Sequence, residues 1–284
     1  MKKSRTLALA PIVCGVALWT FASESVHAPT WLQEPESPAS EVESPDPFRR
    51  VATLGASVTG GFNLEAELGE VVTLADFLVA ASEIEPENVY DGADKYTFWS
   101  PFETTEPLID AVVEFEPTLT FAVDLPFWFL HGPHTDDRRP DALEWLLPRL
   151  EALPGTVVIG TIPLLDAEVS ELMVPQSMRA PAGMVARANE RLAEFALEHE
   201  NVHLLPLAEM FAGLRAEEVP EVRGVDVHPD DLEELLQPDR LHPSVSGTAL
   251  LALAMLEFAD VALEGAITER VEWDLDALVE SIEG

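Results

Sequence analysis

The sequence of 284 residues has little cysteine, few basic side chains and no long apolar run beyond its N-terminal segment. Its one cysteine, Cys14, lies in that segment. If the segment is removed as a signal, the mature protein has no cysteine, which excludes disulfides, a thiol nucleophile and cysteine-ligated metals. Sixteen Lys and Arg stand against 52 Asp and Glu, for a formal net charge of −36 at pH 7. This balance argues against a nucleic-acid partner, because phosphate binding requires basic side chains.

Residues 1–28 have the three parts of a secretory signal peptide. Basic residues precede an apolar stretch over 7–22, and the small residue Ala28 ends the segment. The alternative is a membrane anchor, but the apolar stretch is shorter than the roughly 20 residues that span a bilayer. We therefore predict a secreted or periplasmic protein whose mature chain has no membrane span.

Residues 29–47 contain five prolines, set among Glu and Ser side chains. Such a composition forms neither a helix nor an inner strand, so the segment is predicted to be a linker. Residues 48–284 then form one folded domain.

Within residues 48–284, short apolar runs alternate with segments of helical spacing. Strands are predicted over 50–54, 119–123, 156–162 and 202–207, and helices over 72–81, 107–116, 142–153, 183–200 and 244–262. Apolar runs without a two-residue alternation are typical of parallel strands buried on both faces. The pattern predicts an α/β fold in three layers, with a central parallel sheet and a ligand site at the carboxyl ends of its strands.

A glycine-rich turn, GASVTGG over residues 55–61, directly follows the first predicted strand. A serine in this turn, Ser57, lies where a tight turn exposes both its hydroxyl group and its backbone N–H. The simpler interpretation is a βα turn in which Ser57 caps a helix. The turn is not G-x-S-x-G, since Thr59 stands at the final glycine position, so the nucleophile elbow of α/β-hydrolases is not supported.

A second candidate segment, PDRLHPS over residues 238–244, precedes the last long predicted helix. Asp239 is three residues before His242, close enough in a tight loop to reach the imidazole Nδ1. That contact fixes the tautomer and stabilises the imidazolium that forms when histidine takes a proton from a serine. The alternative is a surface turn with Ser244 as a helix cap. Together the two segments supply a nucleophile, an orienting acid and a base in the order Ser57, Asp239, His242.

At these residues the sequence resembles the SGNH/GDSL hydrolase family. LGASVTGG is similar to the family's first block, with Ala56 in place of its usual aspartate, and DRLHPSVSG is similar to its last block. The segments 157–163 and 188–207 resemble its fourth strand and its long helix with the following strand. The resemblance covers about residues 50–262. It implies a flavodoxin-like sheet and serine ester hydrolysis, in which Ser57 attacks an acyl carbon while His242 and Asp239 act as base and orienting acid.

The resemblance also implies an oxyanion hole built from the serine N–H, a glycine and an asparagine. Gly92 is the candidate glycine, although an ordinary turn glycine explains it equally well. No Gly-x-Asn-Asp is present, and the equivalent strand leads to Asp124. An ionised carboxylate cannot donate a hydrogen bond, so Asp124 serves in the oxyanion hole only if burial keeps it protonated. The alternatives are another role for Asp124 and donation by the Trp128 indole N–H.

Two further groups of residues carry weaker signals. His131, His134 and Asp136 are of metal-binding types, but Gly132 and Pro133 prevent a rigid helical pair, and a loop at the rim of the active site is the preferred interpretation. Aromatic side chains either line an acyl or sugar pocket or pack in the core: Phe98, Trp99, Phe102, Phe127, Trp128 and Phe129. We predict no metal and no organic cofactor.

The function predicted from sequence is hydrolysis of a carboxylic ester by a Ser-His-Asp triad. The substrate is a small-molecule, carbohydrate or lipid ester, and neither the acyl group nor the oligomeric state follows from the sequence. The alternative from another class is a non-catalytic exported binding protein that retains the SGNH fold. The absent asparagine favours this alternative, whereas the presence of Ser57, Asp239 and His242 favours an enzyme.

Overall fold

The computed structural model describes residues 45–216, 221–225, 227 and 234–284. These residues belong to one compact unit. The predicted signal peptide (1–28) and the predicted linker up to residue 44 lie outside the described residues. The proposed boundaries of both segments therefore stay predictions.

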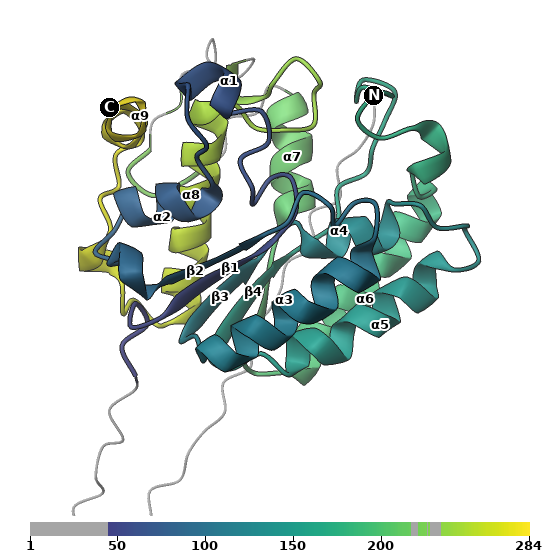
Figure 1. Ribbon diagram of the computed structural model, residues 1–284, viewed down its shortest axis with the longest axis horizontal. Helices are drawn as coiled ribbons and strands as arrows, with labels where there is room; N and C mark the ends of the chain where they lie inside the picture. Colours follow the sequence, from purple (N-terminus) through teal and green to yellow (C-terminus); the bar gives the residue numbers. More distant parts are fainter. Residues whose placement is uncertain (1–44, 217–220, 226, 228–233) are drawn as a thin grey trace, which may run out of the picture. The chain divides into compact units, whose positions relative to one another are not determined.

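A five-stranded sheet forms the centre of the fold (Figure 1). Its strands are β1 (Val51–Gly55), β2 (Val89–Ala93), β3 (Leu119–Ala122), β4 (Thr156–Gly160) and β5 (Val202–Leu205). Neighbouring strands are all parallel, in the order β2-β1-β3-β4-β5. This confirms the predicted α/β fold with a parallel sheet, and the strand order is the flavodoxin-like one.

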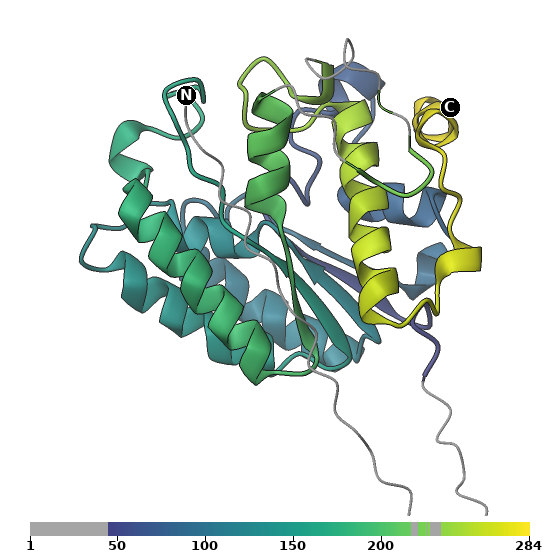
Figure 2. The same ribbon diagram turned by 180° about the vertical axis from the view of Figure 1, so that it is seen from behind.

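Helices cover both faces of the sheet (Figures 1 and 2). The helices are α1 (Glu65–Leu68), α2 (Leu74–Ala80), α3 (Pro101–Phe115), α4 (Leu125–Leu130), α5 (Arg139–Glu151), α6 (Ala182–Glu198), α7 (Leu207–Arg215), α8 (Val245–Ala262) and α9 (Leu275–Glu283), with 3₁₀ turns η2 (Pro86–Asn88), η3 (Gln176–Met178) and η5 (Thr268–Arg270). Helices α3, α4, α5 and α6 pack on one face, and α2, α8 and α9 pack on the other. The predicted three-layer arrangement is therefore present.

Burial on both faces explains why the strands lack an alternating pattern. Ala52 and Leu54 of β1 belong to the hydrophobic cluster under α3 and α5, whereas Val51 belongs to the cluster under α2 and α8. All five residues of β1 are buried. Since both sides of the strand contact apolar helices, polar residues at every second position would be left without water.

Helix α8 is apolar over most of its length because it is a core helix. Ser244 begins it, accepting a hydrogen bond from the Gly247 N–H at 3.1 Å. By length and composition alone α8 could cross a membrane, but 72% of that stretch is buried inside the domain. Its contacts with α2 and α9 account for its hydropathy without a bilayer.

The strand order predicts where in the sheet a ligand site lies. Sheet order reverses between β1 and β3, because the chain goes from β1 to its neighbour β2 and then returns to β3 on the other side. In open parallel sheets, ligands bind at the carboxyl ends of the strands that flank such a reversal. Ser57 follows the end of β1 by two residues, and Asp124 follows the end of β3 by two residues.

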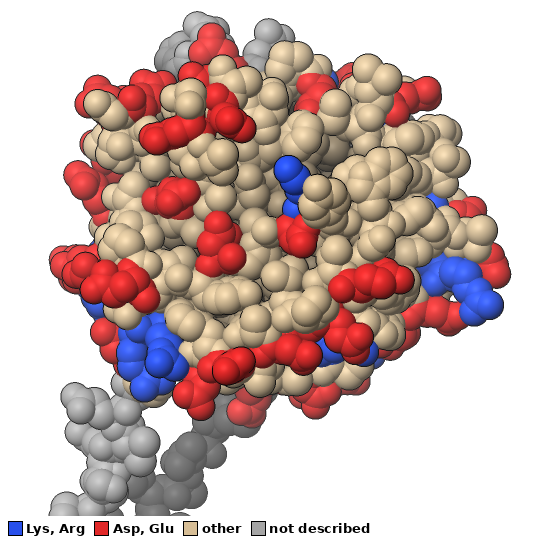
Figure 3. All heavy atoms as spheres, viewed as in Figure 1, with Lys and Arg blue, Asp and Glu red and all other residues tan. Residues whose placement is uncertain are grey.

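Acidic side chains are spread over the face shown in Figure 3, with few basic groups between them. Several arginines are tied to carboxylates rather than free to bind anions. Arg215 contacts Asp166 and Glu168 at 2.5 and 2.9 Å, and Arg191 contacts Glu144 at 2.8 Å. The prediction against a nucleic-acid partner rests on this charge and stays a prediction.

Candidate functional site

Ser57 lies on a helical turn that begins directly after β1. The Gly60 N–H donates to the Ala56 carbonyl at 2.8 Å, and the Phe62 N–H donates to the Ser57 carbonyl at 2.9 Å. The first N–H groups of a helical turn have no partner within the turn. No described residue accepts a hydrogen bond from the Ser57 N–H, so this donor is open to an oxygen atom of a ligand.

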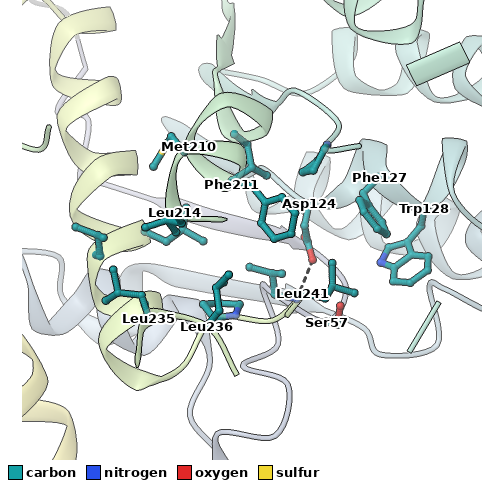
Figure 4. A pocket seen from close by; sticks show the side chains of 17 residues that line it. Ser57, Asp124, Phe127, Trp128, Met210, Phe211, Leu214, Leu235, Leu236 and Leu241 are labelled. Atoms are coloured by element: carbon teal, nitrogen blue, oxygen red, sulfur yellow. Dashed lines mark hydrogen bonds between the residues drawn. The ribbon is translucent and has the colours of Figure 1, made fainter. Parts of the chain in front are cut away.

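The Asp124 carboxylate holds this turn from the neighbouring strand. Its oxygens accept hydrogen bonds from the N–H groups of Ala56, Val58 and Thr59 at 3.0 to 3.3 Å and from the Thr59 hydroxyl at 2.6 Å. Figure 4 shows the carboxylate directed at the turn beside Ser57. Burial raises the pKa of Asp124 above its ordinary value, and these hydrogen bonds oppose part of that shift. The carboxylate thus takes up the donors on either side of Ser57 and leaves the Ser57 N–H unused.

Gly55 is a glycine because the Asp124 carboxylate occupies the space beside it. A Cβ at position 55 would lie 1.9 Å from Asp124 Oδ1 and 2.2 Å from Thr59 Oγ1. Neither atom can move away without breaking the 2.6 Å bond between them. Gly55 therefore lacks a side chain because the Asp124 carboxylate needs that space.

Asp239 and His242 meet in the loop before α8. Asp239 Oδ2 lies 2.7 Å from His242 Nδ1, and Oδ1 accepts from the N–H groups of Leu241 and His242 at 2.9 and 3.0 Å. Burial raises the pKa of Asp239, but the hydrogen bonds from His242 and the backbone outweigh it, so the pKa lies below its ordinary value. Because this carboxylate can only accept, His242 carries its proton on Nδ1, and Nε2 is left as the basic atom.

The serine turn and the histidine loop are joined through the buried side chain of Gln237. Its amide nitrogen donates to the carbonyls of Phe62 and Pro243 at 2.7 and 2.8 Å. Its amide oxygen accepts from the Asn63 side chain at 3.4 Å, and its backbone N–H donates to the His242 carbonyl at 2.8 Å. One side chain thus fixes the position of both segments.

Replacing Gln237 by leucine is expected to lower kcat by about 10- to 100-fold while KM changes less than about twofold. The variant keeps the volume but leaves the Phe62 and Pro243 carbonyls without their donor, and a displacement of about 1 Å between catalytic groups costs about this much in rate. Steady-state kinetics on an ester substrate measure the split. The matched control is Asn63→Gly, which tolerates the positive φ of 64° at that position and removes only the weak contact. Equal losses in both variants would contradict the role of Gln237.

His242 Nε2 is buried and has no hydrogen-bond partner among the described residues. The Phe62 ring stacks on the imidazole, with 4.2 Å between ring centroids and an angle of 28°. Ser57 lines the same cavity as Leu241 and Pro243, the two neighbours of His242. The structure thus brings the turn and the loop together but joins Ser57 and His242 by no hydrogen bond.

The two remaining oxyanion candidates lie in different places. Gly92 lies inside β2, where it pairs with Leu54 of β1. Leu54 precedes Ser57 by three residues, so Gly92 lies within the sheet and not at the strand end beside Ser57. A Cβ at Gly92 would lie 2.7 Å from the Thr53 carbonyl oxygen, so packing between strands explains the glycine. Trp128 lines the cavity that contains Ser57, and Figure 4 shows its indole nitrogen on the side of the ring facing Ser57.

A pocket lined almost wholly by apolar side chains adjoins Ser57 (Figure 4). We call it the apolar pocket. Its walls come from α4, α7, α8 and the loop before α8, and include Phe127, Trp128, Met210, Phe211, Leu214 and Leu250. Phe127 and Trp128 were among the pocket candidates predicted from the sequence, whereas the contribution of α7 was not predicted. The only signal for α7 is a run of apolar residues at helical spacing, which does not reveal what it faces.

His131 lies in the core instead of at a rim, which corrects the sequence-based interpretation. Its Nδ1 accepts from the Ala180 N–H at 3.0 Å, so Nε2 carries the proton and donates to the Pro163 carbonyl at 3.0 Å. Asp136 accepts from Arg139 at 3.0 Å. Among the described residues no group of three His, Cys, Asp or Glu side chains is placed to hold a metal.

Stability is expected to fall by about 3 kcal/mol as the pH drops from 6.5 to 4, because of His131. Burial lowers the pKa of His131 to about 4, so the unfolded chain binds a proton in this window that the folded protein refuses. The free energy of unfolding is therefore unaffected by His131 above pH 6.5 and decreases as the pH falls below that value. Urea unfolding at pH 7.0 and 4.5 measures it, with His131→Gln as the variant that cannot titrate. The same loss in wild type and variant would contradict this assignment.

Comparison with known proteins gives only distant likenesses. No family model matches the sequence, and no curated protein sequence is significantly similar to it. The gut microbial diltiazem-metabolizing enzyme BT4096 is similar in structure at 14% identity and a TM-score of 0.45, over 74% of this chain and 46% of that one. The N-terminal part of BF1531 from Bacteroides fragilis, which contains a phosphatase domain and was solved with Mg, is similar at 13% identity and a TM-score of 0.45, over 76% and 52%. The chain thus spans about half the length of these two proteins, and likenesses at this level say nothing of its activity.

Proposed function

We propose that this protein is a serine hydrolase that cleaves carboxylic esters, as a divergent member of the SGNH/GDSL family. The observation that carries the proposal is the contact of 2.7 Å between Asp239 and His242, in a loop that shares a cavity with Ser57. An aspartate on Nδ1 leaves Nε2 as a base, and Ser57 is the hydroxyl group at the carboxyl end of β1, where ligands bind in such sheets.

In the proposed mechanism, Ser57 Oγ attacks the acyl carbon while His242 Nε2 takes the hydroxyl proton. The carbonyl oxygen becomes an oxyanion, which the Ser57 N–H and the Trp128 indole N–H stabilise. Collapse of this intermediate breaks the ester bond, and His242 gives its proton to the departing alcohol. Water, deprotonated by the same nitrogen, then attacks the acyl carbon. The bond to Ser57 Oγ breaks, His242 returns the proton to that oxygen, and the acid is released.

Two donors replace the family's three in this proposal. Loss of one oxyanion donor costs about 10²–10³ in rate, so an enzyme with two remains an enzyme, though a slower one. Asp124 does not act as a donor in this account. It is a positioning residue that keeps the Ser57 turn in place and the Ser57 N–H free.

A non-catalytic binding protein with the same fold is the second candidate. The observation in its favour is that Ser57 and His242 share no hydrogen bond, while Phe62 covers the imidazole ring. Catalytic hydrogen bonds are often long or absent without substrate, which keeps hydrolysis the better proposal. We further propose that the domain of residues 48–284 is exported after removal of the signal peptide.

Asp239→Asn tests the proposed function. The asparagine oxygen is expected to keep accepting the hydrogen bonds from the Leu241 and His242 N–H groups. Its NH₂ group then faces His242 Nδ1. This forces the proton onto Nε2, so the base is lost and kcat falls by about 10⁴-fold. Hydrolysis of p-nitrophenyl esters by the purified domain measures it. Asp274→Asn is the control, because Asp274 caps α9 and an asparagine caps equally well. Ester hydrolysis that is absent in the wild type, or unchanged in Asp239→Asn, would contradict the proposal.

A further inference from the structure

We infer that the apolar pocket binds the alkyl chain of the acyl group, so that the preferred substrates are esters of fatty acids rather than acetate esters. This inference rests on the proposed function. It assigns each side of the ester to one of two cavities that meet at Ser57.

The chemistry of the pocket wall excludes a polar ligand. Apart from Ser57, Asp124 and the indole N–H of Trp128, the groups that line it are apolar side chains and one glycine. The oxygens of Asp124 already accept four donors of the serine turn, so they offer nothing to a ligand. A sugar in this space would leave its hydroxyl groups without partners, at a cost of about 1–3 kcal/mol for each. A hydrocarbon chain meets no such penalty and gains from leaving water.

The size of the pocket fits a chain rather than a methyl group. Its cavity volume is about 90 Å³. A single water molecule needs about 10–15 Å³ by the same measure, so an acetyl methyl group would leave most of the space empty. Figure 4 shows Ser57 and Asp124 between Trp128 on one side and Met210, Leu214 and Leu235 on the other, so a chain starting at Ser57 has apolar contacts along its length.

The second cavity at Ser57 suits the alcohol. Ser57 shares this cavity with the turn of residues 60–63 and with Glu65 and Lys95, and its lining is more polar than that of the apolar pocket. In ester hydrolysis the alcohol leaves before water attacks the acyl group. The polar lining of the second cavity can hydrogen-bond to the departing alcohol and to the incoming water, while the apolar pocket retains the acyl chain. The acyl group therefore belongs to the apolar pocket.

Two series of esters test this assignment. With p-nitrophenol as the constant leaving group, kcat/KM is expected to rise about 250-fold from acetate to hexanoate, since each of the four added methylenes contributes about fourfold when buried. The isomers methyl octanoate and heptyl acetate separate the two cavities, because they place the same chain on opposite sides of the ester bond. Methyl octanoate is expected to be hydrolysed faster. An enzyme that prefers the acetate esters in both series would overturn the inference.

A variant that fills the apolar pocket tests whether Leu214 contacts the alkyl chain of the acyl group. Leu214→Trp is expected to lower the ratio of octanoate to acetate hydrolysis by at least about tenfold, because the indole takes the space of several methylenes. The matched control is Leu197→Trp on α6, where the side chain is 88% exposed, and it should leave the ratio as in wild type. A ratio unchanged in a folded Leu214→Trp protein would contradict the assignment.

Binding without catalysis separates this inference from the proposed function. Decanoate is expected to bind the Ser57→Ala variant in calorimetry, and Leu214→Trp added to that variant should weaken binding at least about tenfold. Decanoate binding in a protein that hydrolyses no ester would overturn the hydrolase but keep the pocket. Hydrolysis of acetate esters with no decanoate binding would keep the hydrolase and overturn the pocket assignment, and absence of both would overturn both.

Discussion

Ser57→Ala is expected to lower kcat for ester hydrolysis by about 10⁶-fold, the loss typical of removing the nucleophile from a triad. The variant lacks the oxygen that would form the acyl-enzyme, while Asp239, His242 and the apolar pocket stay in place. The small remaining rate would come from binding and from the oxyanion donors. Stability should change little, since the Ser57 side chain is only half-buried and an alanine fits the same turn.

Ser244→Ala is the matched control for this experiment. Ser244 stands two residues after His242, but its hydroxyl caps α8. Its loss should cost about 1 kcal/mol of stability and leave kcat within a few-fold of wild type. Hydrolysis by Ser57→Ala at a rate near that of wild type would end the assignment of Ser57 as nucleophile.

Asp124→Ala is expected to cause the largest loss of stability of any substitution considered, about 4 kcal/mol or more. It removes the acceptor for three backbone N–H groups and for the buried Thr59 hydroxyl, and each unsatisfied buried donor costs about 1–3 kcal/mol. Activity should fall as well, because the turn that carries Ser57 loses its support. Urea unfolding and ester hydrolysis measure the two effects.

Asp124→Asn distinguishes a positioning role from an oxyanion donor. An amide can turn its oxygen to the three N–H groups and its NH₂ to the Thr59 hydroxyl, so it should retain most of the stability and much of the activity. If Asp124 instead occupied the place of the family's asparagine without donating, Asp124→Asn would supply the missing oxyanion donor and raise kcat by about 10²–10³. Such a rise, with little destabilisation in Asp124→Ala, would contradict the positioning role.

The sequence allowed the sheet to be predicted where strands are buried on both faces, as in β1, β3 and β4. It missed β2, an edge strand in which Asp91 and Gly92 weaken the apolar signal. It also placed the start of α3 at Pro107, whereas the helix begins at Pro101 and carries Pro107 inside. Proline is a good first residue of a helix, and both positions satisfied that rule.

Contacts close in the chain could be predicted, and distant ones could not. Asp239 and His242 are three residues apart, so their meeting follows from a tight loop. Asp124 is 65 to 68 residues from the turn it holds, and Gln237 is 175 residues from Phe62. Neither pairing can be predicted from a single sequence. The first depends on β1 and β3 being neighbours in the sheet, and the second on the loop before α8 lying beside the turn after β1.

The intact mass of the protein after treatment with a fluorophosphonate shows whether Ser57 is an activated nucleophile. This reagent phosphonylates a serine only where a base and an oxyanion hole activate it. We expect one adduct on the wild-type domain, none on Ser57→Ala, and an unchanged adduct on Ser244→Ala. A wild-type protein that takes up no label, or a Ser57→Ala protein that takes up as much, would show that Ser57 is not the activated nucleophile.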